Sequence, residues 1–230
     1  MKRLIMSDKY SCFYNELIDI GYQIIPTDTI VVFHTPEQKH ADMQCLKIDD
    51  KYFILNECDR LKHSLNPLNP IVISHKAGKK YPENVLLNCL YLDNILYGKS
   101  SAISSEVKEY CNENNIKIVN VNQGYTRCST LIVNEKAAIT ADISIAKALK
   151  NNGVEVMKIS EGHIILEGFN YGFIGGASGK IDNRIVFFGN VKNHPDFNKI
   201  ETFIKNHGKD IQILCPQMPL TDIGGIVEKE

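Results

Sequence analysis

The stretch Asn122–Ile159, NQGYTRCSTLIVNEKAAITADISIAKALKNNGVEVMKI, predicts a complete structural unit. Ser129–Val133 is rich in Thr, Ile and Val, the residue types that suit a pleated, half-buried strand. A polar Asn-Glu pair interrupts the run, and Ala137–Thr140 resumes it as a second strand. The two strands are therefore expected to form a hairpin.

A helix and a third strand follow this hairpin. Asp142 stands where a helix N-cap is expected, because its carboxylate can accept hydrogen bonds from the free backbone N–H groups of the first turn. Apolar residues then recur at helical spacing as far as Gly153, which readily takes the left-handed conformation that ends a helix. Val154–Ile159 supplies the third strand. The unit is strand, strand, helix, strand.

The rest of the chain repeats this unit. Polar pairs that break a hairpin recur at Asp49-Asp50, Asp93-Asn94, Asn134-Glu135 and Asp182-Asn183. The strands that follow each helix begin near Tyr22, Ile71, Ile116, Val154 and Ile211. Both markers give a period of roughly 46 residues, which is the range expected of repeat architectures.

The two ends of the sequence together supply one more unit. Lys2–Met6, Ser7–Ile20 and Tyr22–Ile25 predict a strand, a helix and a strand, and Ile223–Val227 predicts the missing strand. A closed ring of five units would leave no exposed sheet edge. The alternative is an open α/β sheet, which would alternate one strand with one helix. We therefore predict an α/β ring of five ββαβ modules, forming a single domain over residues 1–230, whose last module is shared by both termini.

Small residues occur at the same phase of every unit. They are Cys45, Cys89, Cys128, Gly175 and Gly224. Small side chains at this phase would let five strands converge on a common axis, so close packing is the favoured interpretation of these cysteines. A catalytic role for one of them is the alternative.

Composition limits the classes of function. The 26 Lys and Arg residues nearly balance the 27 Asp and Glu residues, giving a net charge of -1 without any long basic run. This argues against a DNA partner or an anionic membrane surface. The first residues form too short an apolar run for a signal peptide, and no segment reaches membrane-spanning length. A cytoplasmic protein is expected.

The seven cysteines are scattered, odd in number and free of C-x-x-C pairs. This distribution is typical of a reducing compartment, so no disulfide is predicted. Metal ligands do not cluster along the sequence, and the sequence therefore predicts neither a metal site nor a cofactor.

Five segments resemble an uncharacterised bacterial family with the pentein fold of the guanidino-group-modifying enzymes. They are GYTRCSTLIV (124–133), AITADISIAKAL (138–149), GHIILEGFNYGFIGGASG (162–179), GNVKNHPD (189–196) and TDIGG (221–225). The resemblance implies a pentein-like propeller with pseudo-fivefold symmetry. Its enzymes include arginine deiminase, agmatine deiminase, dimethylarginine dimethylaminohydrolase and the amidinotransferases.

The resemblance implies much less about activity. In these enzymes a Cys thiolate attacks the guanidinium carbon, with a His and carboxylates beside it. That Cys lies shortly after a Gly-Gly strand in the last module, whereas Gly224-Gly225 is followed here by Ile226–Glu228 without a Cys. Cys215 precedes the Gly pair, and His163 lacks the H-x-D pattern of the enzymes. We predict that the fold carries over without thiol-dependent guanidine hydrolysis; any activity would be that of a hydrolase or transferase acting on guanidino compounds.

Seven polar residues are the candidates for binding a ligand. They are Arg127, His163, Glu167, Asn170, Ser178, His194 and Asp222. Each has a structural alternative: Arg127 as a solvated strand-end charge, Asp222 as a turn cap, and the glycine-rich segment around Ser178 as a tight turn. In the sequence His194-Pro195-Asp196, helix capping explains the last two residues.

Two functions remain open from the sequence. One is the binding of a small guanidino or amino-acid-like ligand in the central funnel, which the polar candidates favour. The other is a non-enzymatic pentein that binds a protein or ribonucleoprotein, as the similar translation initiation factor six does. The length, close to five modules without an inserted lid, favours this second function.

Overall fold

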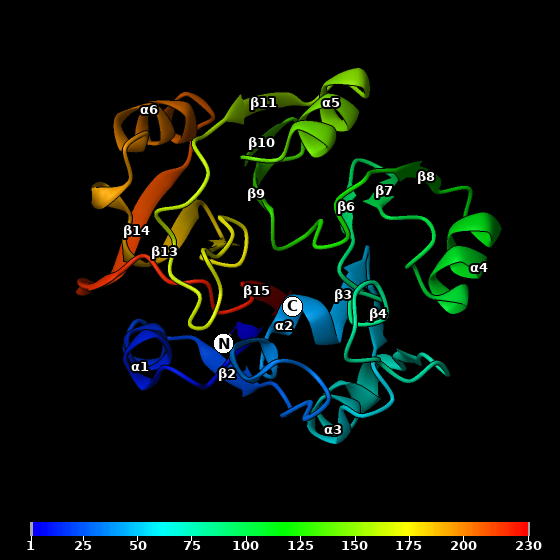
Figure 1. The fold of residues 1–230 in the computed structure, drawn as a ribbon. Coiled ribbons are helices and arrows are strands. Elements are labelled where there is room, and N and C mark those ends of the chain that lie inside the picture. Colours follow the sequence, from blue (N-terminus) through cyan, green and yellow to red (C-terminus); the bar gives the residue numbers. More distant parts are fainter. Residues whose placement is uncertain (1, 230) are drawn as a thin grey trace.

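The computed structural model describes residues 2–229, and in this range the strands group into five three-stranded sheets. Figure 1 shows the five sheets placed around the middle of the molecule, with most helices on the outside and the short α2 near the middle. The architecture is therefore mixed α/β with one small sheet for each predicted module.

The stretch Asn122–Ile159 folds as predicted. β9 (Thr130–Asn134) pairs antiparallel with β10 (Ala137–Thr140), which pairs parallel with β11 (Glu155–Lys158). The connecting helix is α5 (Ile143–Asn151). The Asp142 carboxylate accepts a hydrogen bond of 2.8 Å from the backbone N–H of Ile145, and Gly153 adopts a φ of +83°. Both predicted ends of the helix are confirmed.

Three further sheets repeat this order, with the first two strands antiparallel and the third parallel to the second. One contains β3 (Cys45–Ile48), β4 (Lys51–Ile54), α3 (Asp59–Leu65) and β5 (Ile71–Val72). The next contains β6 (Leu90–Leu92), β7 (Ile95–Gly98), α4 (Ser105–Glu113) and β8 (Lys117–Asn120). The third contains β12 (Ser178–Ile181), β13 (Arg184–Asn190), α6 (Phe197–Asn206) and β14 (Asp210–Pro219). Three of the four predicted hairpin breaks fall between paired strands, and the fourth, Asn134-Glu135, begins at the last residue of β9.

The fifth sheet combines both ends of the chain. Its strand order is β15 (Ile226–Lys229), β1 (Arg3–Met6) and β2 (Gln23–Pro26), and α1 (Ser11–Asp19) connects the last two. Since β15 runs antiparallel to β1 and β2 runs parallel to it, this sheet repeats the pattern of the other four. The predicted sharing of one sheet by the two ends is confirmed. The remaining short elements are η1 (Thr35–Glu37), α2 (Ala41–Gln44), η2 (Asn66–Leu68) and η3 (Val191–Asn193).

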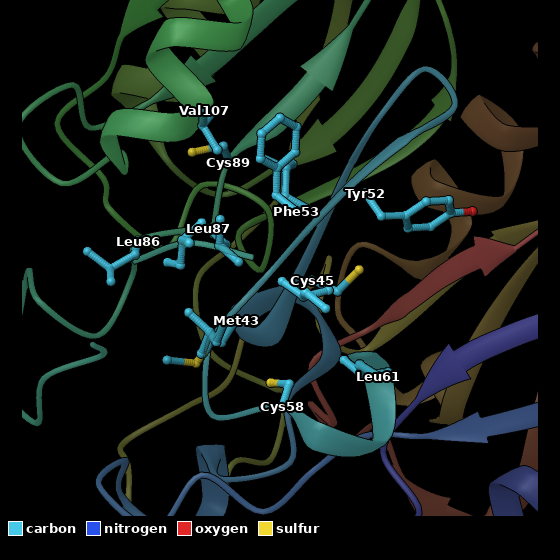
Figure 2. Packing of buried hydrophobic residues seen from close by; sticks show 14 of the residues in the cluster. Met43, Cys45, Tyr52, Phe53, Cys58, Leu61, Leu86, Leu87, Cys89 and Val107 are labelled. Atoms are coloured by element: carbon cyan, nitrogen blue, oxygen red, sulfur yellow. The ribbon is translucent and has the colours of Figure 1, made fainter. Parts of the chain in front are cut away.

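Buried apolar side chains hold helices against sheets and modules against one another. Figure 2 shows part of the largest cluster, in which Met43, Phe53 and Leu87 pack together with Cys45 and Cys89. All seven cysteines are free in the described part of the chain. Within residues 2–229, none of the helices combines the length and hydropathy that crossing a membrane requires.

Close approach at the centre explains two of the small residues. A Cβ on Gly175 would lie 2.4 Å from the carbonyl oxygens of Arg127 and Thr130. Gly224 has a φ of +81°, and its Cβ would lie 2.4 Å from the Cα of His40. Any larger residue would push these segments apart.

Candidate functional site

Three polar side chains from distant modules meet in the middle of the molecule. His40 and Asp42 lie at the start of α2, and Cys128 lies just before β9. One ligand atom from each of the three lies within 4.8 Å of the others, and all three residues are buried. We call these three residues the central cluster.

Asn88 fixes the central cluster from the segment before β6. Its side-chain oxygen accepts hydrogen bonds from the backbone N–H groups of Arg127 (2.8 Å) and Cys128 (3.2 Å). Its amide nitrogen donates to the Asp42 carbonyl oxygen (3.2 Å) and to Cys128 Sγ (3.0 Å). One buried amide therefore links the segment that carries Asp42 to the segment that carries Cys128.

Asp222 lies beside the cluster, from the segment before β15. Its two oxygens accept hydrogen bonds from the backbone N–H groups of Phe173 (2.8 Å) and Gly224 (3.0 Å). Its Oδ1 lies 3.9 Å from Nδ1 of His40. A Cβ on Gly176 would lie 1.9 Å from this oxygen, so glycine is required for Asp222 to reach its position.

Burial controls the charges in this region. Burial, reinforced by the nearby Asp222 carboxylate, raises the pKa of Asp42 to about 8. Burial lowers the pKa of His40 to about 3 and raises the pKa of the Cys128 thiol well above its usual range. At neutral pH Asp42 is therefore mostly protonated, His40 is a neutral imidazole and Cys128 is a thiol.

Several buried polar atoms of the cluster have no hydrogen-bond partner. Among the described residues, no N–H or O–H group donates to either carboxylate oxygen of Asp42, and Nε2 of His40 is also unpartnered. Asp42 has only the weak S–H donor of Cys128 beside it, and this contact moderates the rise of its pKa. Such orphaned atoms are rare in folded proteins and need an explanation.

A groove of about 520 Å³ opens near the cluster. Its lining residues are His34, Lys79, Lys80, Tyr81, Asn84, Tyr125 and Phe169. We call it the aromatic groove, because Tyr81 stacks on Tyr125 with ring centroids 6.0 Å apart and His34 meets Phe169 edge-on at 5.8 Å.

Glu37 is buried next to Tyr125, which lines this groove. The Tyr125 hydroxyl hydrogen-bonds to Glu37 and accepts a hydrogen bond of 2.6 Å from the Asn84 amide nitrogen. Burial raises the pKa of Glu37. Glu37 Oε2 and Asn84 Oδ1 are buried without a hydrogen-bond partner among the described residues. Both atoms can therefore accept a hydrogen bond from a ligand.

The structure brings two of the seven candidate ligand residues to the cluster. Asp222 touches it as described, and the half-buried Arg127 lies near Asp42, whose carboxylate offsets the lowering of the Arg127 pKa by burial. Arg127 Nη1 donates to the Thr130 carbonyl oxygen at 3.1 Å. Arg127 also lines a separate hollow of about 440 Å³, to which the first strands of all five sheets contribute.

The other five candidates lie elsewhere. His163, Glu167 and Asn170 are exposed, and Glu167 lies 3.6 Å from the Lys9 ammonium. The buried Ser178 donates to the Ile174 carbonyl oxygen at 2.6 Å.

His194 is buried against the ring of His163 at 5.5 Å between centroids. The expected capping of α6 by Asp196 is wrong. Its carboxylate accepts instead from the backbone N–H of Ser160 at 2.7 Å.

His40, Asp42 and Asn88 were missed from the sequence. Each stands just before the first strand of its module, at nearly the phase of the repeat that Cys128 occupies. Aligning polar residues as well as small ones at this phase would have found them. Cys215, by contrast, lies in another buried cluster with Phe13 and Phe188.

Solved structures of several enzymes are similar to this chain in fold. A dimethylarginine dimethylaminohydrolase variant from Pseudomonas aeruginosa complexed with citrulline is 10% identical, with a TM-score of 0.58 over 93% of this chain and 91% of that one. A C. jejuni agmatine deiminase with substrate bound is 9% identical, with a TM-score of 0.58 over 99% and 93% of the two chains. An amidinotransferase of saxitoxin biosynthesis from Microseira wollei is 11% identical, with a TM-score of 0.54 over 87% and 73%. The protein therefore has the pentein fold of guanidino-modifying enzymes.

At the level of sequence, the Family of unknown function (DUF6873) matches residues 4–227. The chain belongs to this family. None of the curated proteins matches it.

Proposed function

We propose that this pentein-fold protein binds a small guanidino or amino-acid-like molecule in the aromatic groove. The observation that carries the proposal is the pair of unpartnered acceptors, Glu37 Oε2 and Asn84 Oδ1, beside aromatic rings. Leaving buried acceptors unpaired is costly, so the ligand that fits must bring N–H donors. A guanidinium or ammonium group brings donors together with a positive charge, which suits Glu37 and the faces of Tyr81 and Tyr125.

The rim of the groove favours a ligand with a negative charge at its other end. Lys79 and Lys80 line the groove and are exposed. Two ammonium groups would repel a purely cationic ligand and attract a carboxylate. Arginine, which carries a guanidinium and a carboxylate, therefore fits this arrangement better than agmatine.

The wider architecture that frames this groove is part of the proposal. We take the five sheets as a single-domain propeller with pseudo-fivefold symmetry, because all five first strands line the 440 Å³ hollow. The central funnel then runs between this hollow and the aromatic groove. The relatives with citrulline or substrate bound support a small polar ligand for this fold.

The proposed function is binding, without the guanidine hydrolysis of the relatives. The sequence resemblance supports this, because Ile226–Glu228 follows Gly224-Gly225 without the Cys that the enzymes carry after their Gly-Gly strand. Cys128 is buried, and burial keeps its thiol protonated.

Isothermal titration with arginine, agmatine and citrulline tests the proposal. Citrulline replaces the guanidinium of arginine with a neutral urea group, so arginine should bind at least about tenfold more tightly. Glu37→Gln should remove this preference, while Glu113→Gln on the exposed face of α4 should keep it. Equal binding of arginine and citrulline, or no binding of any of the three, would overturn the proposal and favour a protein or ribonucleoprotein partner.

A further inference from the structure

The proposed function places the ligand in the aromatic groove and does not involve the residues of the central cluster. Yet His40, Asp42 and Cys128 converge from two modules, and each is at most 3% exposed. Polar side chains are rarely gathered at the middle of a fold unless something satisfies them.

The unpartnered atoms show what kind of ligand is missing. Both oxygens of Asp42 and Nε2 of His40 are buried without a hydrogen-bond partner in the described structure. A carboxylate, an imidazole nitrogen and a thiolate are electron-pair donors, so all three can satisfy one electron-pair acceptor together. A metal ion is such an acceptor, and it also offsets the cost of placing Asp42 beside Asp222.

We infer that the central cluster binds one zinc-type divalent ion through a ring nitrogen of His40, a carboxylate oxygen of Asp42 and Sγ of Cys128. Nitrogen, oxygen and sulfur from these residue types are the donors that zinc takes in proteins. The thiolate disfavours Mg²⁺ and Ca²⁺, which prefer oxygen ligands alone. The ion would displace the protons of Asp42 and Cys128 to solvent, and the two anionic ligands that result would balance its charge.

The required movement is small. The ligand atoms lie within 4.8 Å of one another, and bonds to zinc of about 2.0–2.3 Å bring tetrahedral ligand atoms to roughly 3.5 Å apart. A contraction of about 1 Å therefore closes the site.

Neighbouring residues already lie against two of the three ligands. The amide nitrogen of Asn88 donates to Cys128 Sγ at 3.0 Å, which favours the thiolate. Asp222 Oδ1 lies 3.9 Å from His40 Nδ1 and is itself held by the backbone N–H of Gly224. Metal ligands in proteins are usually oriented by such outer contacts. Three protein ligands leave a fourth position for water or a small molecule, as in zinc sites that are not purely structural.

Metal titration of the full chain tests this inference without any organic ligand. Chelator-treated protein is dialysed against Zn²⁺, and the bound metal is counted by mass spectrometry. One equivalent is expected. With Co²⁺, the unmodified protein should show a thiolate-to-cobalt charge-transfer absorption band. This band requires a sulfur ligand, so it tests the role of a cysteine without any substitution. Substoichiometric zinc, or Co²⁺ binding without this band, would overturn the inference.

Variants then assign the ligands. Asp42→Asn preserves shape and removes the carboxylate, and it should weaken zinc binding at least tenfold, as should Cys128→Ser. Cys89→Ser, at another buried cysteine, should leave both the stoichiometry and the cobalt band unchanged. Circular dichroism shows whether each variant is folded. If Cys128→Ser does not fold, the loss of zinc affinity in Asp42→Asn tests the inference. A cobalt band that survives in folded Cys128→Ser, or is lost in Cys89→Ser, would contradict the assignment.

The outcome is independent of the proposed function. Glu37→Gln removes the carboxylate next to the aromatic groove and should not change zinc stoichiometry. Zinc binding without arginine binding would therefore reject the proposed function and keep this inference, and the reverse result would do the opposite.

Discussion

The pattern His-x-Asp occurs twice in this protein, with opposite consequences. In His194-Pro195-Asp196 the Asp196 carboxylate accepts hydrogen bonds from the backbone N–H of Ser160 (2.7 Å) and the ammonium of Lys199 (3.2 Å). The pKa of Asp196 is lowered to about 2, chiefly by the hydrogen bond from Ser160.

In His40-Ala41-Asp42 the carboxylate receives no N–H or O–H donor from the described residues, and burial raises its pKa to about 8. The same two residue types therefore give a hydrogen-bonded carboxylate next to α6 and an unpartnered one at the centre of the molecule, while Nε2 of the histidine is buried without a partner in both. The difference comes from the partners that the fold supplies and not from the pattern. An unsatisfied site is the better candidate for binding something else.

The largest expected effect is on the contacts that hold the central site together. Asn88→Ala removes four hydrogen bonds and leaves two buried N–H groups and a carbonyl unpaired. The free energy of unfolding should fall by about 3 kcal/mol, measured by urea denaturation. Asn114→Ala, at a φ of -102° that Ala adopts without strain, removes one exposed hydrogen bond of 2.8 Å to the Tyr110 carbonyl oxygen and should cost less than about 0.5 kcal/mol. Similar losses in both variants would mean that Asn88 does not organise the centre.

The two carboxylates should give opposite pH dependences in chelator-treated protein. Asp42 has a raised pKa in the folded state. Its contribution to the free energy of unfolding is therefore fully present below the unfolded pKa near 4 and is lost as the pH rises through about 8. Asp42→Asn should therefore gain stability relative to the unmodified protein, by at least about 1 kcal/mol, between about pH 5 and pH 8.

Asp196 has a lowered pKa in the folded state. Its contribution to the free energy of unfolding is therefore present above the pKa of the unfolded state and is lost as the pH falls through about 2. Asp196→Asn should therefore be destabilised at neutral pH, and the difference should shrink in acid. Urea denaturation across the pH range measures both. If the free energy of unfolding changed with pH in the same way in both variants, the claim that the two carboxylates differ in pKa would be wrong.

Cysteine reactivity should separate the centre from the surface. Cys12 is half-buried, whereas the six other cysteines are buried. Burial raises the pKa of Cys45 and of Cys89 to about 12 and that of Cys128 well above its ordinary value. Reactivity follows exposure and thiolate character, so a thiol reagent should label Cys12 first and Cys128 slowly. Peptide mass spectrometry after timed labelling measures this order. Fast labelling of Cys128 would contradict this expectation and favour the alternative that Cys128 is a catalytic nucleophile.

The smallest expected effect is on guanidine turnover, which should be absent. Arginine, agmatine and methylated arginine should give no citrulline or carbamoylputrescine above the level of buffer. The reason is that the buried Cys128 holds its proton and that the segment Ile226–Glu228 after Gly224-Gly225 contains no Cys. Colorimetric detection of the ureido group measures this. Turnover that disappears in Cys128→Ala would show that the central cluster catalyses, and turnover that disappears in Cys215→Ala would point to the other cysteine.

The sequence by itself determined the modules of this protein. Hairpin breaks such as Asp93-Asn94, the cap Asp142 and the stop Gly153 act within a few residues, so their effects are readable locally. The shared fifth sheet was also predictable, because neither end of the sequence contains a whole module. The expected cap at Asp196 failed because the distant Ser160 competes for its carboxylate.

Only the tertiary structure decided the central cluster. Asp42, Asn88, Cys128 and Asp222 come from four modules. The repeat phase that Asp42, Asn88 and Cys128 nearly share indicates that they approach the centre, but it does not show which atoms touch or stay unpartnered. Local signals also favoured His163 and Glu167, which lie close together in sequence but are exposed in the fold. Burial and hydrogen-bond partners depend on how modules pack around the centre, and those two quantities set the charge of Asp42 and leave its oxygens free.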